Sequence, residues 1–298
     1  IIALLNANVV VASESTTVAL GELSSPTVVL SLVGLLIIGA LQHYKVPGGI
    51  LLGILITWVL GIIAQLVGWY VPNPEAGVYS VIPQFSLSSF EAPKMFQFDF
   101  GFIAKNVPAF ILIVFTFLYT DIFDTVGTLI GVAEKGKLLD KDGSLPNATG
   151  ALMADAVGTV VGACLGTSTV TSYVESSAGV AAGGRTGLTA VTTAVLFFIS
   201  LIFAPIFTSI PSFATTPAML YVGLLMLSSI RQVKFDGDIA DAIGAFLAII
   251  MMPLTYSIAN GIMFGIVSWV ILKLVTGKAK DISAVMWISV VLFAIYIG

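Results

Sequence analysis

Most of this sequence consists of apolar runs of about 17 to 25 residues, the length that an α-helix needs to cross a lipid bilayer. Hydrophobic residues make up 58% of the chain and charged residues 9%, and the mean hydropathy is +1.07. Such a composition argues against a soluble globular domain. The chain has no basic stripe with interleaved aromatic residues, so nothing suggests a nucleic-acid partner. We therefore expect an all-α polytopic membrane protein.

Polar connections, many of them with proline or glycine, separate the predicted apolar crossings. The longest connection, residues 72–104, is rich in Pro, Ser and Phe, and we expect it outside the membrane. The first run starts at Ile1 without a methionine, so we expect the chain to be the C-terminal part of a longer protein. The last run is short for a full crossing. The apolar runs cover residues 1–12, 26–41, 48–71, 107–132, 147–165, 188–207, 214–230, 242–257, 260–275 and 284–297.

A polar stretch from Gly166 to Gly187 interrupts this pattern. Eight of the eleven residues from Thr167 to Ser177 carry a hydroxyl group. If crossings alternate and the first one leads outward, 10 of the 12 basic residues fall on the inside, provided that residues 166–184 count as one crossing. We therefore expect the polar stretch to traverse the membrane, where it would line a cavity rather than face lipid.

Within this stretch, two patterns predict two pieces of structure. Polar residues recur at every second position from Thr167 to Glu175, which predicts a short strand. Ser172 and Glu175 have the spacing of a capping box, which predicts a half-helix that starts near the middle of the membrane. Its N-terminus would offer N–H groups and a positive dipole end to a ligand. The three glycines of residues 158–166 form a double GxxxG pattern, which lets another backbone approach closely.

Four acids lie inside predicted crossings with no Lys, Arg or His among them: Asp121, Asp124, Asp155 and Glu175. An acid at the centre of a spanning helix costs about 2.5–3.5 kcal/mol, so four of them imply a function. Asp121 and Asp124 are three residues apart and share a helix face. Such acids could bind and release protons. Structural roles also stay open, with Glu175 as a cap, Asp124 as a hydrogen-bonded support and Asp155 as a tie to a neighbouring helix.

Longer motifs carry a resemblance to a known family. They are TDIFDTVGTLIGVA at Thr120 to Ala133, ADAVGTVVGACLGTSTVTSYVESSAGVAAGGRTGLTA at Ala154 to Ala190, MMPLTYSIANGI at Met251 to Ile262, and LLGILITWVLGI near Leu51. Along essentially its whole length, the chain resembles the purine permeases of the adenine/guanine/hypoxanthine branch of the nucleobase:cation symporter-2 (nucleobase/ascorbate transporter) family. The resemblance implies fourteen transmembrane segments in two inverted repeats of seven, divided into core and gate domains, with a short strand and half-helix in the tenth segment. By this comparison the chain starts late in the fifth segment.

The same resemblance assigns each part of the chain to that fold. Residues 1–71 would be gate-domain helices of the first repeat, namely part of segment five with segments six and seven, and 72–104 an extracytoplasmic loop. Residues 105–207 would be core-domain segments eight to eleven. Residues 208–276 would be gate-domain segments twelve to fourteen, and 277–298 a C-terminal tail with a short apolar segment.

By position, the resemblance implies that Asp121 and Glu175 hydrogen-bond the base. A carboxylate suits this role because it can accept two adjacent N–H donors of a purine. The uracil and xanthine branch has a glutamate before a histidine in the eighth segment, where this chain has Asp-x-x-Asp. Neighbouring residues would add substrate contacts, and two further acids would carry the proton or support the site. The neighbours are Thr171, Tyr173 and Val174, and the further acids are Asp124 and Asp155.

We expect a multi-pass protein of the cell membrane that imports purine nucleobases by proton symport, with an elevator-like core movement. Its partners would be the purine, a proton, the bilayer and a second copy in a homodimer, and we expect no cofactor, metal or enzymatic activity. A same-fold transporter of xanthine, uracil or another small solute stays an alternative. A sulfate-type anion transporter would need a cationic residue at the site. A membrane-embedded enzyme with an acidic pair would need a metal and basic residues nearby, which Asp121 and Asp124 lack.

Overall fold

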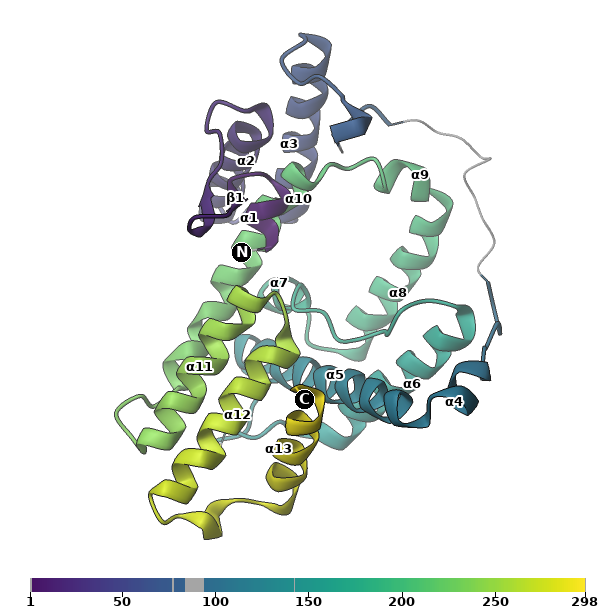
Figure 1. The fold of residues 1–298 in the computed structure, drawn as a ribbon. Coiled ribbons are helices and arrows are strands. Elements are labelled where there is room, and N and C mark those ends of the chain that lie inside the picture. The colour runs from purple at the N-terminus through teal and green to yellow at the C-terminus, as the bar shows by residue number, and fades with distance from the viewer. Residues whose placement is uncertain (1, 77, 84–93, 142, 298) are drawn as a thin grey trace. The chain divides into compact units, whose positions relative to one another are not determined.

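The computed structural model describes residues 2–76, 78–83, 94–141 and 143–297, and helices dominate it (Figure 1). Among these residues, five helices are long and apolar enough to cross a membrane: α2 (Pro26–His43), α3 (Gly49–Leu66), α5 (Val107–Gly136), α6 (Ala148–Leu165) and α12 (Ile258–Val275). Shorter apolar helices in the same residues are α8 (Gly187–Ile202), α10 (Ser212–Met226), α11 (Ile239–Thr255) and α13 (Ala284–Ile297). The prediction of a helical polytopic membrane protein is confirmed, apart from one small sheet.

The remaining elements are short. They are α1 (Ile2–Asn6), β1 (Val10–Ser13), β2 (Thr17–Leu20), η1 (Pro74–Ala76), α4 (Gly101–Lys105), α7 (Ser176–Ala181), α9 (Ala204–Phe207), η3 (Leu227–Gln232) and η4 (Ala279–Asp281). Two compact units divide the chain: unit 1 comprises Ile1–Ala92 and Val174–Leu227, and unit 2 comprises Pro93–Tyr173 and Ser228–Gly298. The predicted gate and core domains divide the chain at other positions, and that assignment stays a prediction.

In unit 1, helices α2, α3 and α10 pack on one another. Helix α2 begins where the sequence predicts, because the Ser25 hydroxyl accepts the Val28 N–H and Pro26 occupies the first helical position. Phe213 of α10 is buried against Gly61 of α3, where an added Cβ would lie 2.6 Å from the ring Cζ. The absence of a side chain at Gly61 therefore sets how closely α3 and α10 approach.

The predicted helix over residues 1–12 is wrong beyond Asn6. Helix α1 ends there, Asn8 has φ +58°, and β1 and β2 form an antiparallel hairpin in which Val10 pairs with Leu20. β-branched valine and threonine residues, which fill much of this segment, favour strands. Apolar character alone does not distinguish a short strand from the end of a helix.

In unit 2, helices α11 and α12 lie side by side (Figure 1). Tyr256 has φ +53° between them, and the Ser257 hydroxyl then caps α12. The contact is built from small residues, among them Gly244, Ala248 and Gly265. An added Cβ on Gly265 would lie 2.9 Å from both the Ala248 Cβ and the Gly244 carbonyl oxygen. The glycines therefore let the two backbones approach closely at this contact.

Gly261→Ala is expected to destabilise unit 2 by roughly 1–3 kcal/mol, because overpacking a tight contact forces neighbours apart. The new Cβ would overlap Met252 Cγ and lie 2.9 Å from the Ala248 carbonyl oxygen. Gly223→Ala in α10 is the matched control, since a Cβ there meets nothing within 4 Å. The measurement is the thermal unfolding midpoint of the purified protein in detergent. Equal midpoints for the two variants would contradict this packing.

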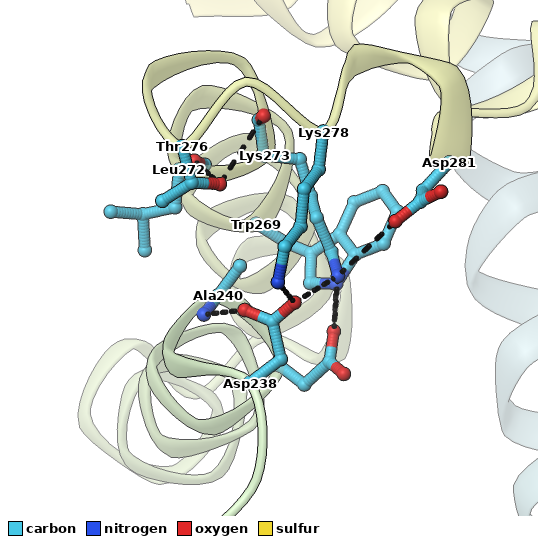
Figure 2. Close-up of polar contacts among 9 residues, drawn as sticks. Asp238, Ala240, Trp269, Leu272, Lys273, Thr276, Lys278 and Asp281 are labelled. Carbon is cyan, nitrogen blue, oxygen red and sulfur yellow. Dashed lines mark hydrogen bonds and ion pairs between the residues drawn. The ribbon is translucent and has the colours of Figure 1, made fainter.

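Charged side chains gather at one end of the α11 and α12 pair (Figure 2). The Asp238 carboxylate accepts hydrogen bonds from Lys273 Nζ at 2.6 Å and from Lys278 Nζ at 2.8 Å. Lys273 Nζ also lies 3.4 Å from Asp241 Oδ1 and 3.9 Å from Asp281 Oδ2. This cluster, which we call the Asp238 cluster, joins α11, α12 and η4.

Candidate functional site

The polar stretch begins where α6 ends, at Gly166. This residue has φ +79°, and an added Cβ would lie 2.5 Å from the Lys94 carbonyl oxygen, so only glycine fits here. Residues 167–173 then run without helix or strand. The predicted short strand is therefore wrong within the described residues, since these residues hydrogen-bond to helices α5 and α6 rather than to another strand.

The predicted half-helix is confirmed as α7, but the predicted capping box is wrong. Glu175 occupies the N-cap position with φ −60° and makes no capping hydrogen bond with its side chain. Ser172 lies further upstream, and its hydroxyl donates to Asp155 Oδ1 at 3.0 Å instead. The carboxylate of a neighbouring helix is a stronger acceptor for this hydroxyl than the polar groups of its own backbone.

A network of hydroxyls and one carboxylate ties the polar stretch to α5 and α6 in unit 2. Thr125 of α5, only 1% exposed, donates from Oγ1 to Asp155 Oδ2 of α6 at 2.9 Å. Thr125 Oγ1 also lies 3.1 Å from Thr171 Oγ1. Ser172 donates to the other oxygen of Asp155. The pair formed by Thr125 and Asp155 is therefore hydrogen-bonded to two residues of the polar stretch, Thr171 and Ser172. We call Thr125, Asp155, Thr171 and Ser172 the Asp155 network.

A second set of contacts involves Asp121. Thr169 Oγ1 donates to Asp121 Oδ1 at 3.1 Å, and Thr159 of α6 donates to the Val170 carbonyl oxygen at 2.7 Å. Val170 lies over the glycine face of α6, because an added Cβ on Gly162 would lie 2.7 Å from Val170 Cγ2. The polar stretch therefore packs on the glycine face of α6 mainly through side chains.

A cavity of about 390 Å³ opens beside the Asp155 network. It is lined by Leu129, Ala151, Ala154, Asp155, Gly158, Val170, Thr171 and Ser172. Two predicted site residues, Asp155 and Thr171, therefore share one cavity. Asp124 is half-buried on α5, where the charges of Asp121 and Asp155 act on it. Tyr173, which ends the first of the two segments of unit 2, is 57% exposed.

The other predicted site residues, Val174 and Glu175, belong to unit 1. Glu175 lines a cavity of about 1140 Å³ together with α7, α10 and the turn between α2 and α3. The walls are mainly apolar, with Gln42, Lys45 and Tyr221 as further polar residues. Because Asp121 and Glu175 lie in different units, their joint action on one base stays a prediction.

The sequence pattern does not single out Thr125 and Thr159, and it includes Thr169 only as a member of the period-two run. Thr125 follows Asp121 by four residues and so shares its helix face, which is the one signal that could have identified it. Chemically, the site offers carboxylate and hydroxyl oxygens, which suit N–H donors. In the described ranges, no three or more His, Cys, Asp or Glu residues are arranged to hold a metal ion.

Comparison with known proteins identifies the family of this chain. A family model described as "Permease family" matches residues 2–264. A protein of Methanocaldococcus jannaschii that is named as a permease is 42% identical, over 99% of this chain and 64% of that protein. The adenine permease AdeQ of Escherichia coli (strain K12) is 38% identical, over 98% of this chain and 62% of its own length. The guanine/hypoxanthine permease PbuG of Bacillus subtilis (strain 168) is also 38% identical, over 99% of this chain and 64% of its own length.

The chain therefore spans about 62–64% of the length of these relatives. The family match, by contrast, covers most of the chain. Permeases are transporters and not enzymes, and the long apolar helices identify a multi-pass protein of the cell membrane. On the extent of the family match and these identities, the chain belongs to the permease family.

Proposed function

We propose that the complete protein imports purine nucleobases across the cell membrane. The observation that carries this proposal is the set of acids and hydroxyls at the polar stretch, with Asp121 and Asp155 as its carboxylates. Purines present N–H donors, and carboxylates are the strongest acceptors for such donors among side chains. Relatives named as adenine and guanine/hypoxanthine permeases support the same substrate class.

In this proposal, Asp121 and Glu175 accept the N–H groups of the base, and Thr171, Tyr173 and Val174 make further contacts. Asp124 and Asp155 carry the coupled proton or support the site. Uptake is driven by proton symport, the core domain moves against the gate domain like an elevator, and two copies form a homodimer. An acidic site suits proton symport because uptake of a proton lowers the cost of burying its negative charge.

The test is uptake of radiolabelled adenine, guanine, hypoxanthine, xanthine and uracil by cells that express the complete coding sequence. We expect at least one of adenine, guanine and hypoxanthine to be taken up well above the level measured in vector-only cells. A protonophore is expected to abolish this uptake. Uptake of uracil alone would overturn the substrate class, and uptake of xanthine alone would overturn the expected preference for adenine, guanine or hypoxanthine. Uptake that needs sodium and survives the protonophore would overturn the coupling ion.

A further inference from the structure

The hydrogen bonds of the Asp155 network have a direction, which follows from counting protons. Each threonine hydroxyl has one proton to donate and lone pairs to accept with. The Asp155 carboxylate can only accept, so Thr125 uses its single proton in the 2.9 Å bond to Asp155 Oδ2. In the 3.1 Å contact between Thr125 and Thr171, the donor must then be Thr171. The protons therefore point from Thr171 to Thr125 to Asp155.

This direction depends on the acceptor role of Asp155. Its two oxygens accept from hydroxyls of two different elements, Oδ2 from Thr125 and Oδ1 from Ser172. Both oxygens therefore serve as acceptors, and in this arrangement Asp155 donates no proton to Thr125.

We propose that Thr125 is a positioning residue that makes Thr171 an acceptor-only group toward the substrate. Thr171 lines the cavity of about 390 Å³, and its proton is committed to Thr125, so only its lone pairs are left for a ligand. Such a group binds an N–H of a base and discriminates against a ring nitrogen that carries no hydrogen. This inference rests on the proposed function, because it takes the ligand to be a nucleobase.

Thr125→Val tests the proposal, because valine keeps the shape of threonine and removes the hydroxyl. In uptake assays with the complete protein, we expect the KM for the transported purine to rise roughly tenfold or more, with a smaller change in the maximal rate. Thr125→Ser restores the hydroxyl and is expected to restore the KM. Thr128→Val is the matched control, since Thr128 is also buried on α5, at 4% exposure, and lies outside the Asp155 network.

A double-mutant cycle separates this role from a general effect on stability. If Thr125 acts through Thr171, the KM of the double variant Thr125→Val/Thr171→Val equals that of Thr171→Val alone, rather than the product of the two single effects. Membrane levels and unfolding midpoints of all variants are measured in parallel. A KM for Thr125→Val equal to that of the parent, or multiplicative effects in the cycle, would overturn the proposal. A parent protein that takes up no nucleobase would instead overturn the proposed function.

Discussion

Asp121→Asn is expected to lower the initial rate of purine uptake by about 100-fold at low substrate concentration, since hydrogen bonds to a charged group contribute about 1.5–3 kcal/mol each. Thr169 occupies Asp121 Oδ1, so the second oxygen is left to receive an N–H of the base. Asparagine can place its NH₂ group where that oxygen lies. The NH₂ group and the N–H of the base are both donors, so no hydrogen bond forms between them. The loss therefore comes from a changed hydrogen-bond pattern in a side chain of nearly the same shape.

Initial rates of radiolabelled purine uptake, normalised to the amount of protein in the membrane, measure this effect. Glu175→Gln makes the equivalent change at the N-cap position of α7 and is expected to have a similar effect. Asp236→Asn is the matched control, because Asp236 is exposed in the connection before α11. Parental uptake by both Asp121→Asn and Glu175→Gln would remove these two acids from the proposed binding site.

Helix positions were predictable because they depend on the chain's local apolar character. The run 26–41 corresponds to α2 (Pro26–His43), and the run 260–275 to α12 (Ile258–Val275). Hydropathy does not specify what a short apolar segment becomes, and the hairpin of β1 and β2 therefore replaces the end of a predicted helix. Its formation depends on pairing between two segments rather than on either one alone.

The candidate site was predictable in its residue types and only partly in its contacts. An acid inside a crossing is evident from the sequence, which is how Asp121 and Asp155 were found. The hydrogen-bond partner of a hydroxyl depends on which helix lies opposite it. The sequence pattern alone does not specify how the helices pack against the polar stretch. For this reason Ser172 was assigned to a capping box with Glu175, whereas its hydroxyl binds Asp155. For the same reason the role of Thr125 was missed.

The Asp238 cluster shows the same limit for charged residues. The alternation of crossings predicts that Lys273 and Lys278 are among the ten basic residues on the inside of the membrane. Their shared partner, Asp238, is 35 residues from Lys273 and 40 from Lys278 in the sequence. Only the packing of α11 on α12 brings these groups together, and it leaves Lys273 with a side chain that is 7% exposed.

Asp238→Asn is expected to lower the thermal unfolding midpoint by several degrees at neutral pH. Asparagine is as good an N-cap as aspartate, so the hydrogen bond from the Ala240 N–H to this side chain can persist. What is lost is the negative charge that lies 2.6 Å from the nearly buried Lys273 Nζ. Removing one partner of a buried ion pair leaves the other charge poorly compensated, which is the more damaging change.

The pH dependence of stability distinguishes the loss of charge from any change in packing. Hydrogen bonds from Lys273 and Lys278, and then from the Ala240 N–H, hold the pKa of Asp238 well below its usual range. For an acid with a lowered pKa in the folded state, the stabilisation is complete above the unfolded-state pKa of about 4 and is lost as the pH falls toward the folded-state pKa. The difference between the midpoints of the parent and Asp238→Asn should therefore be constant near neutral pH and shrink below about pH 4.

Asp281→Asn is the control for this experiment, because Asp281 is 58% exposed and lies 3.9 Å from the same lysine nitrogen. A contact at that distance with an exposed carboxylate contributes little, since water and salt screen that carboxylate. Midpoints are measured in detergent across the pH range, with added salt as a second variable. Because Asp238 and Lys273 are mostly shielded from solvent, the effect of Asp238→Asn should persist in high salt, whereas any effect of Asp281→Asn should vanish. Equal midpoints for the two variants at neutral pH would show that Asp238 does not hold α11, α12 and η4 together.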